Sequence, residues 1–189
     1  LWVILQLAQQ LYDCARHGLD MFVTVNLSPR QFLQADLVET IRRALEATGA
    51  PAHNFVVEIP ESVQMLDIQR VQSILLALRQ AGVRVALDRF GSGFSSLERL
   101  HAELITLLKI DRKFLFHAAT NAAALNVTVA ALGVARGLRL RPVAVGVENE
   151  SQLSLCRQLE CEYVQGNLVY VPTDAAQVSE LARAGRLLR

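Results

Sequence analysis

The sequence predicts an α/β protein built as a TIM-like (β/α) barrel, and three observations support this fold class. Short apolar segments alternate with helical segments along the chain. The connections between them are too short for a separate domain. Nearly every apolar segment ends in one polar or charged residue. Continuous apolar strands are typical of parallel sheets buried on both faces, and the carboxyl ends of barrel strands form the active-site face.

The first half of the chain contains three helices, each with a stop signal. Gly18 follows the first helix as a C-cap, Gly49 and Pro51 end the second, and Gly82 ends the third. In chain order we expect a helix over 3–17, a strand over 21–26, a helix over 35–48, a strand over 54–59 that breaks at Pro60, and a helix over 67–81.

The second half continues the alternation and brings the expected number of strands to six. The apolar stretch Phe114–Ala135 is long enough to span a bilayer, but polar residues interrupt it at helical spacing, which favours a buried amphipathic helix over a membrane span. Right-handed crossovers leave a barrel or an open doubly wound sheet. We expect strands over 83–88, 104–110, 140–147 and 163–168, and helices over 118–136, 151–160 and 175–184, with a short helix ahead of residue 104.

Composition limits the classes of function. The 189 residues, 52% of them apolar, predict one domain over 1–189. The formal net charge of +1 gives no field that favours DNA, RNA or an anionic membrane. Cys14, Cys156 and Cys161 form no CxxC pair, so we expect ordinary packing in a reduced, cytoplasmic compartment.

The residues at the strand ends predict one polar cluster that could hold a metal. Two of them have a plainer interpretation, because Asn26 could be a turn former and Lys109 could make a structural ion pair with Glu58 or Asp88. Buried carboxylates at the ends of apolar strands need partners, which favours a ligand-facing role for Glu58 and Asp88. The cluster consists of Asn26, Glu58, Asp88, Lys109 and Gln165.

The sequence motifs around these strand ends are more specific than the chemistry of the single residues. Six motifs occur in order: VNLSPRQF (25–32), VEIPES (57–62), LDRFGSGFSSL (87–97), LKIDRKF (108–114), AVGVENESQL (144–153) and YVQGN (163–167). Together they resemble the EAL domain family, bacterial phosphodiesterases of the second messenger cyclic di-GMP. The resemblance implies a modified (β/α)8 barrel of the EAL type. The family's Glu-Ala-Leu would lie ahead of Leu1, so we expect the chain to lack the first strands and to be incomplete at its N-terminus.

The resemblance also implies roles for individual residues. The family cuts one phosphodiester linkage with two divalent metals, which are Mg or Mn if activity remains. By motif, Asn26, Glu58 and Asp88 match metal ligands, Lys109 matches the lysine near the attacking water, and Gln165 matches a site glutamine. Two further residues, Glu61 and Glu148, match glutamates that support loops.

Two departures from the family pattern predict a degenerate site. Arg89 stands where the family's DDFG has a second aspartate, and arginine is a permanent cation. Val145 stands where AEGVE has a glutamate, so the general-base position is lost and Lys109 is a vestigial catalytic residue. We therefore expect the metal positions to be empty or weak, and no cofactor.

Arg89 has two interpretations. Its guanidinium could point away from the site and pair with a surface carboxylate. Alternatively, it could replace a metal and grip a phosphate oxygen directly, in a ligand-binding set with Asn26, Glu58, Asp88, Lys109 and Gln165.

Three functions stay open at this point. The first is an inactive receptor or regulatory module that binds cyclic di-GMP. The second is an active phosphodiesterase that hydrolyses cyclic di-GMP to pGpG with a divalent metal, and the third is an interaction scaffold that binds no nucleotide. Other signalling domains in a longer chain are expected partners, as is a second copy contacting the loop after the Asp88 strand.

Overall fold

The computed structural model describes residues 2–91, 102–118 and 120–183. Contacts divide the chain into two compact units. The first contains Leu1–Ile59, Gln69–Val85 and Thr173–Arg189, and the second contains Pro60–Ile68 and Ala86–Pro172. The loop residues 92–101, including Ser92, Gly93 and Phe94 of the LDRFGSGFSSL motif, lie outside the described residues.

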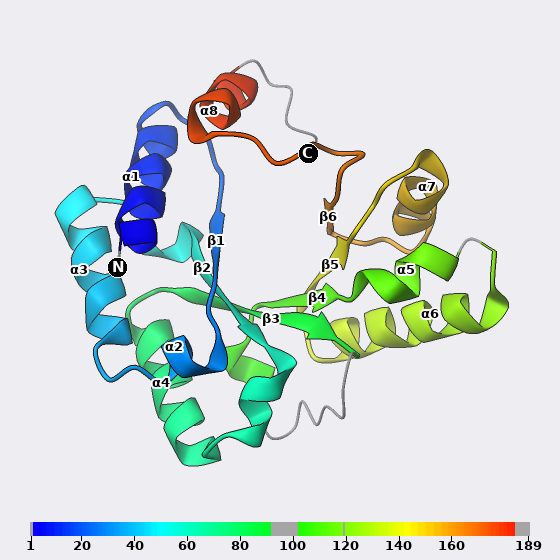
Figure 1. The fold of residues 1–189 in the computed structure, drawn as a ribbon, viewed down its shortest axis with the longest axis horizontal. Coiled ribbons are helices and arrows are strands. Elements are labelled where there is room, and N and C mark those ends of the chain that lie inside the picture. Colours follow the sequence, from blue (N-terminus) through cyan, green and yellow to red (C-terminus); the bar gives the residue numbers. More distant parts are fainter. Residues whose placement is uncertain (1, 92–101, 119, 184–189) are drawn as a thin grey trace. The chain divides into compact units, whose positions relative to one another are not determined.

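The strands form a parallel sheet whose spatial order follows the chain, β1-β2-β3-β4-β5-β6 (Figure 1). This confirms the predicted parallel α/β fold. A sequential order is that of a (β/α) barrel, whereas a doubly wound sheet reverses its order at a switch point. The strands are β1 (Val23–Asn26), β2 (Phe55–Pro60), β3 (Arg84–Phe90), β4 (Leu107–Ile110), β5 (Arg141–Val145) and β6 (Tyr163–Gln165).

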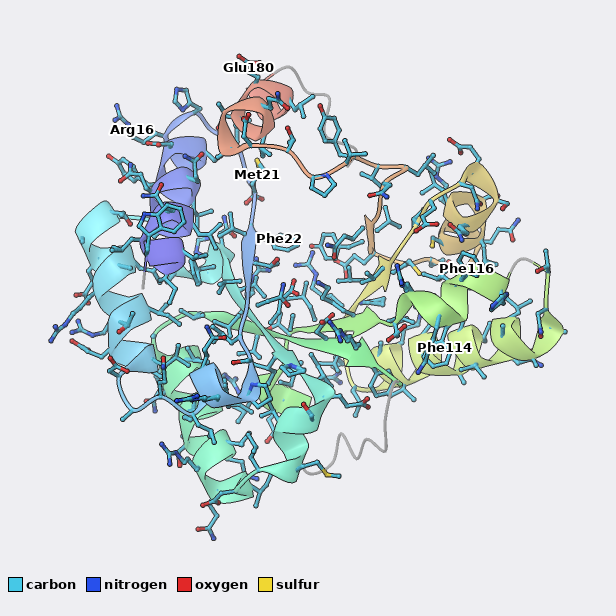
Figure 2. All side chains as sticks on the ribbon, viewed as in Figure 1. Arg16, Met21, Phe22, Phe114, Phe116 and Glu180 are labelled. Carbon is cyan, nitrogen blue, oxygen red and sulfur yellow. The ribbon has the colours of Figure 1, made fainter. Side chains whose placement is uncertain are left out.

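The first unit is built from β1, β2, the start of β3 and the helices that pack near them. Its core includes β2, where Phe55, Val56 and Val57 are fully buried. Phe22, just before β1 and labelled in Figure 2, lies under the guanidinium of Arg84 at 5.1 Å. The helices are α1 (Trp2–Arg16), α2 (Pro29–Phe32), α3 (Leu37–Thr48), α4 (Ile68–Gln80) and α8 (Ala175–Arg183), with a 3-10 helix, η1, at Ala52–Asn54.

The second unit holds the end of β3, all of β4 to β6, and the helices between them. One core cluster joins α5 to β5 and α7 through Leu115, Ala144 and Cys156. A second cluster joins β4 to α6 through Ile110 and Leu132. The helices are α5 (Arg112–Ala118), α6 (Ala122–Gly137) and α7 (Glu150–Gln158), with 3-10 helices η2 (Glu61–Met65) and η4 (Ala102–Leu104).

The apolar stretch 114–135 belongs to two helices: the predicted helix over 118–136 is present as α6, which begins later, at Ala122, and the separate helix α5 before it was not predicted. The side chain of Asn121 accepts from the backbone N–H groups of Ala123 and Ala124, so it caps a new helix, α6. Among residues 2–91, 102–118 and 120–183, every helix is too short or too polar to span a bilayer.

Several strand boundaries also differ from the prediction. The expected strand 104–110 begins only at Leu107, because residues 102–104 form the 3-10 helix η4. Pro60 belongs to β2 instead of breaking it. The strands β5 and β6 end at Val145 and Gln165, two and three residues earlier than expected. The ends of both strands therefore coincide with candidate site positions.

Candidate functional site

In the first unit, two candidate residues lie side by side at the ends of β1 and β2. Asn26 is paired in register with Glu58, and the N–H of Leu27 donates to the Glu58 carbonyl at 2.9 Å. This hydrogen bond continues the parallel ladder one residue beyond β1. Asn26 is exposed, while the Glu58 side chain is almost fully buried, with a residue exposure of 2%.

In the second unit, Asp88 and Arg89 lie in an irregular end of β3. The register between β3 and β4 shifts between Leu87 and Phe90, which is a bulge. Arg89 takes a left-handed conformation with φ 56°. Among residues with a Cβ, Asn and Asp adopt this conformation most readily. A bulge at a strand end redirects side chains, so it sets where these two charges lie.

The Asp88 carboxylate lies between two cations. Lys109 Nζ is 3.8 Å from Oδ1, and Arg89 Nε is 3.6 Å from Oδ2. The two cations differ in setting, because the Lys109 side chain is 8% exposed and the Arg89 side chain is 74% exposed. The predicted ion pair of Lys109 with Asp88 is therefore present, and Arg89 pairs with its own neighbour, Asp88.

At the ends of β5 and β6, Val145 and Gln165 are paired in register. The Gln165 carbonyl accepts from the N–H groups of Gly146 at 2.7 Å and Val147 at 3.0 Å. These bonds hold the turn after β5 against β6. Val145 is half-buried and Gln165 is exposed, so the position where a base is expected is an apolar side chain that borders solvent.

Glu61 contacts the first residue after β3. Its Oε1 accepts from the N–H of Gly91 at 3.5 Å, and its residue exposure is 7%. Gly91 has φ 86°, and a Cβ there would approach Cε2 of Phe114 to 2.6 Å. Phe114 belongs to α5, where Figure 2 labels it. The contact is of the kind that loop support requires, and the supporting role itself stays a prediction.

Glu148 has an exposed side chain, and sequence reasoning missed the residue that holds its backbone. Gln152 Oε1 accepts from the N–H of Glu148 at 2.7 Å and from that of Asn149 at 3.3 Å. Gln152 is 3% exposed and forms a capping box with Asn149 at the start of α7. The signal was present as Asn149-Glu-Ser-Gln152, a variant of the usual capping pattern.

The donors of the second unit do not fit a pair of divalent cations. At positions 88, 89, 109, 145 and 165 there are one carboxylate and two cations. Hard divalent ions need several oxygen ligands, chiefly carboxylates. Over residues 2–91, 102–118 and 120–183, no group of three or more His, Cys, Asp or Glu side chains could hold a metal. The assignment of Asn26, Glu58 and Asp88 as metal ligands stays a prediction.

A parallel sheet in sequential order, with polar residues at the carboxyl ends of its strands, defines a protein of the (β/α)-barrel class. Comparison with known families identifies the family within this class to which the chain belongs. The EAL domain model matches residues 1–172, and the chain belongs to the EAL domain family. The recognition from the six motifs is thereby confirmed.

Similar proteins agree with this family. The cyclic di-GMP phosphodiesterase NbdA of Pseudomonas aeruginosa is 33% identical, over 98% of this chain and 24% of NbdA. A solved structure of the MucR phosphodiesterase in complex with c-di-GMP is 35% identical, with a TM-score of 0.88 over 94% of this chain and 72% of that one. The EAL domain of Mycobacterium smegmatis DcpA is 29% identical, with a TM-score of 0.90 over 99% of this chain and 85% of that one. The chain spans about a quarter of the length of the curated relatives it matches.

Proposed function

We propose that this chain is a degenerate EAL domain that binds cyclic di-GMP as a receptor or regulatory module and hydrolyses it little or not at all. The observation that supports this most is the charge at the strand ends of the second unit. Asp88 is the one carboxylate among the five candidate positions there, and it already pairs with Lys109 and Arg89.

The missing carboxylates matter more than the added cation. Lys109 is the residue type that the family motif has, so it does not distinguish this chain. In the family, carboxylates matching positions 89 and 145 would offset the lysine charge. At about 4 Å, two unit charges interact by roughly 4 kcal/mol at an effective dielectric near 20, and a divalent ion feels about twice that. A metal beside Asp88 would meet the buried Lys109 ammonium without this compensation.

Arg89 contributes less repulsion than its charge suggests. Its side chain is 74% exposed, so solvent and salt screen it, and the guanidinium can move away from an incoming cation. Arg89 weakens metal binding mainly because it stands in place of a carboxylate ligand. The same exposure leaves the guanidinium accessible to an anionic ligand.

The site also lacks a base at the position where the family has one. Val145 cannot accept a proton, and losing a positioned base typically costs about 10²–10⁴ in rate. This change is separate from the Arg89 substitution and lies on a different strand. Both changes lower hydrolysis, and neither removes a donor that a phosphate would need.

The remaining side chains suit a dianionic ligand. Cyclic di-GMP carries two phosphodiester groups, each with one negative charge. Arg89 can donate two parallel hydrogen bonds to a phosphate, exchanging its contact with Asp88 for the ligand. Gln165 is exposed at the end of β6 and can donate or accept. Binding would then need no metal.

A calorimetric titration with cyclic di-GMP, in EDTA and then in Mg²⁺ or Mn²⁺, combined with a hydrolysis assay, tests the proposal. We expect binding in EDTA, an affinity that changes less than about threefold with metal, and no pGpG above background. Binding that disappears in EDTA would overturn metal-free recognition. The absence of binding in every buffer would favour the interaction scaffold.

An active phosphodiesterase is the second candidate, and the retained residues favour it. Asn26, Glu58, Asp88, Lys109 and Gln165 all match the family motif, and similar proteins are named phosphodiesterases. Activity would require Glu58 and Asp88 to hold enough Mg²⁺ or Mn²⁺ without carboxylates at positions 89 and 145. Metal-dependent turnover to pGpG by the unmodified protein would establish this candidate and reject the first.

The partners follow from the same proposal. The chain matches 24% of NbdA, so we propose that it works beside other signalling domains, in a longer chain and in the cytoplasm. A homodimer remains part of the proposal, although residues 92–101, where we expected the contact, lie outside the described residues. Sedimentation of the full-length protein with and without cyclic di-GMP measures the oligomeric state.

A further inference from the structure

Helix α7 ends in a turn that brings two cysteines together. Glu160 has φ 53°, its N–H donates to the Arg157 carbonyl at 3.0 Å, and the N–H of Cys161 donates to the Cys156 carbonyl at 2.9 Å. This pair of bonds is the Schellman motif, in which the first and sixth residues bring their side chains into contact. Here both of those residues are cysteine.

The helices α1, α4 and α6 end with the same two hydrogen bonds, but their motifs do not bring two cysteines together. Their first and sixth residues are apolar, or a cysteine with leucine, so the ordinary content of the motif is a small hydrophobic contact. The pairs are Cys14 with Leu19 after α1, Leu78 with Val83 after α4, and Ala135 with Leu140 after α6. The α1 motif therefore provides an internal reference, with a cysteine at the first position and no thiol at the sixth.

The backbone geometry at α7 allows a disulfide. The Cα of Cys156 lies about 2.4 Å from its own carbonyl oxygen, and the N–Cα bond of Cys161 is about 1.5 Å long. With the 2.9 Å hydrogen bond between them, the two Cα atoms lie at most about 6.8 Å apart. Disulfides form across Cα separations of about 4.4–6.8 Å. Both cysteines are reduced thiols in this structure.

The two thiols have different surroundings. Cys156 is 1% exposed in the core cluster with Leu153 and Val147, whereas Cys161 is half-buried at its edge. A hydrogen bond with Cys156 lowers the pKa of Cys161, burial opposes this, and the nearby Arg136 guanidinium lowers the pKa further. The pKa of Cys156 is raised by the same hydrogen bond and by burial. Cys161 is therefore the accessible thiol that ionises first.

Arg136 is fixed at this corner by two contacts. Its Nη2 donates to the Leu159 carbonyl, and it lies 3.5 Å from Glu160 Oε2. Both partners belong to the turn between the two cysteines, so these contacts place the guanidinium beside the turn. A cation beside a partly exposed thiol is the environment that makes a cysteine reactive.

We propose that Cys156 and Cys161 are an oxidisable dithiol that closes to an intramolecular disulfide with a peroxide as oxidant. The Cys161 thiolate attacks one peroxide oxygen, the O–O bond breaks, and hydroxide leaves, which gives a sulfenic acid. The Cys156 thiol then attacks that sulfur, the S–O bond breaks, and water leaves. The protons of the two thiols end in water, so two thiols and one hydrogen peroxide give one disulfide and two waters.

The disulfide would tie the end of α7 to the residues just before β6. Cys161 lies two residues before Tyr163, where β6 begins, and β6 ends at Gln165. Because the Gln165 carbonyl holds the N–H groups of Gly146 and Val147, a tether on β6 should slow the opening that exposes these amides. We expect their hydrogen exchange to slow by about threefold or more in the oxidised protein.

The test uses the full-length protein, reduced, treated with hydrogen peroxide, blocked with N-ethylmaleimide and analysed by peptide mass spectrometry. We expect a peptide that links Cys156 to Cys161, with a mass loss of about 2 Da from two hydrogens. Cys161 should be consumed at least about tenfold faster than Cys14, which has no thiol at the sixth position of its motif. A Cys161 that overoxidises while Cys156 stays open to N-ethylmaleimide in denaturant would overturn the proposal.

Variants separate the thiol that reacts with peroxide from the thiol that closes the disulfide. If a variant misfolds, the measurement on the unmodified protein still tests the proposal. Cys156→Ala should leave Cys161 as a sulfenic acid that reacts with dimedone. In Cys161→Ala, the buried Cys156 should resist peroxide. Cys14→Ala is the matched control, and it should form the Cys156–Cys161 disulfide at the rate of the unmodified protein. A disulfide that forms equally fast between Cys14 and either partner would contradict a local pair.

Discussion

The two compact units keep different parts of the strand-end chemistry that the family motifs imply. In the first unit, β1 and β2 end in an amide and a carboxylate, Asn26 and Glu58, which lie in register. In the second unit, one carboxylate lies between two cations, and an apolar side chain occupies a position that the motif gives to an acid. The oxygen donors are retained in one unit and diminished in the other.

We propose from this difference that the fold has lost its metal chemistry at one set of strand ends only. At Val145 the parallel ladder and the turn that follows are held by backbone hydrogen bonds, which do not depend on the side chain there, whereas at Arg89 the pairing of β3 with β4 is interrupted by a bulge. Under the proposed function, a binding surface persists after the groups that activate water are lost. Substitutions can restore carboxylates to the strand ends of the second unit, or test how tightly its backbone is packed.

Restoring the carboxylates should give the largest effect. The double variant Arg89→Asp with Val145→Glu replaces one cation and one apolar group by acids, at a left-handed position that Asp tolerates and at a half-buried strand end. We expect Mn²⁺-dependent formation of pGpG to rise by at least about 10²-fold over the unmodified protein. The measurement is a hydrolysis assay on the full-length protein.

The matched control for that variant is Arg139→Asp. Arg139 is also an exposed arginine in a left-handed conformation, with φ 58°, but it lies after α6 instead of at a strand end. It makes the same change of charge as the Arg89→Asp part of the double variant, in the same backbone shape, and should leave turnover at background. Equal activity in both variants would mean that charge near the strand ends does not govern catalysis.

The segment just after β6 should be intolerant of added volume. A Cβ at Gly166 would lie 2.1 Å from the Val147 carbonyl oxygen and 2.3 Å from its nitrogen, and this backbone is held by Gln165. We expect Gly166→Ala to lower the free energy of unfolding by about 2–3 kcal/mol in a denaturant titration.

Gly133→Ala provides the reference for that measurement. Gly133 lies inside α6, and a Cβ added there would meet nothing within 4 Å, so the change should raise the free energy of unfolding by about 0.5–1 kcal/mol. If Gly166→Ala did not lower the free energy of unfolding, the segment after β6 would not be tightly packed against Val147.

Removing the Arg89 charge should weaken nucleotide binding moderately. A hydrogen bond to a charged group is worth about 1.5–3 kcal/mol, and exposure reduces this, so we expect Arg89→Asn to lower the affinity for cyclic di-GMP by about tenfold. Arg139→Asn should change it by less than about twofold. Calorimetry in EDTA compares the two, and equal affinities would remove Arg89 from the ligand-binding set.

The smallest effect concerns carboxylate–arginine pairs on α3, well away from any strand end. Hydrogen bonds from Arg42 and Arg43 lower the pKa of Glu39 to about 2, from 4.5. Because the folded-state pKa lies below the unfolded value, the contribution to stability is present above pH 4.5 and is lost as the pH falls toward 2.

The Glu39 side chain is 41% exposed, so salt should screen the effect. We expect an NMR titration to give a low pKa at low salt that rises toward 4.5 in about 1 M NaCl, where screening is nearly complete, or in Arg42→Gln. An unshifted pKa at low salt would show that these surface pairs are too mobile to hold a proton off the carboxyl group.

Local signals predicted much of the fold. The apolar runs that end in Asn26, Glu58 and Asp88 predicted a parallel sheet, and the structure confirms it. Glycine marked the ends of α1, α3 and α4, where Gly18, Gly49 and Gly82 all take positive φ. These features depend on a few neighbouring residues, so one sequence is enough to reveal them.

Features set by contacts between elements were missed. The left-handed conformation of Arg89 arises where β3 shifts register against β4, and arginine gives no local sign of it. The break between α5 and α6 depends on Asn121 capping a new helix inside an apolar stretch. The ion pair of Asp88 with Lys109 was foreseen as one of two options, because adjacent strand ends were expected but their pairing was not.

The most direct test of this account is anomalous diffraction from crystals of the full-length protein soaked in Mn²⁺. We predict no pair of bridged ions beside Asp88, with Lys109 Nζ remaining against its carboxylate. Two Mn²⁺ ions sharing Asp88, with Arg89 displaced into solvent, would contradict the claim that this strand end has lost its metal chemistry.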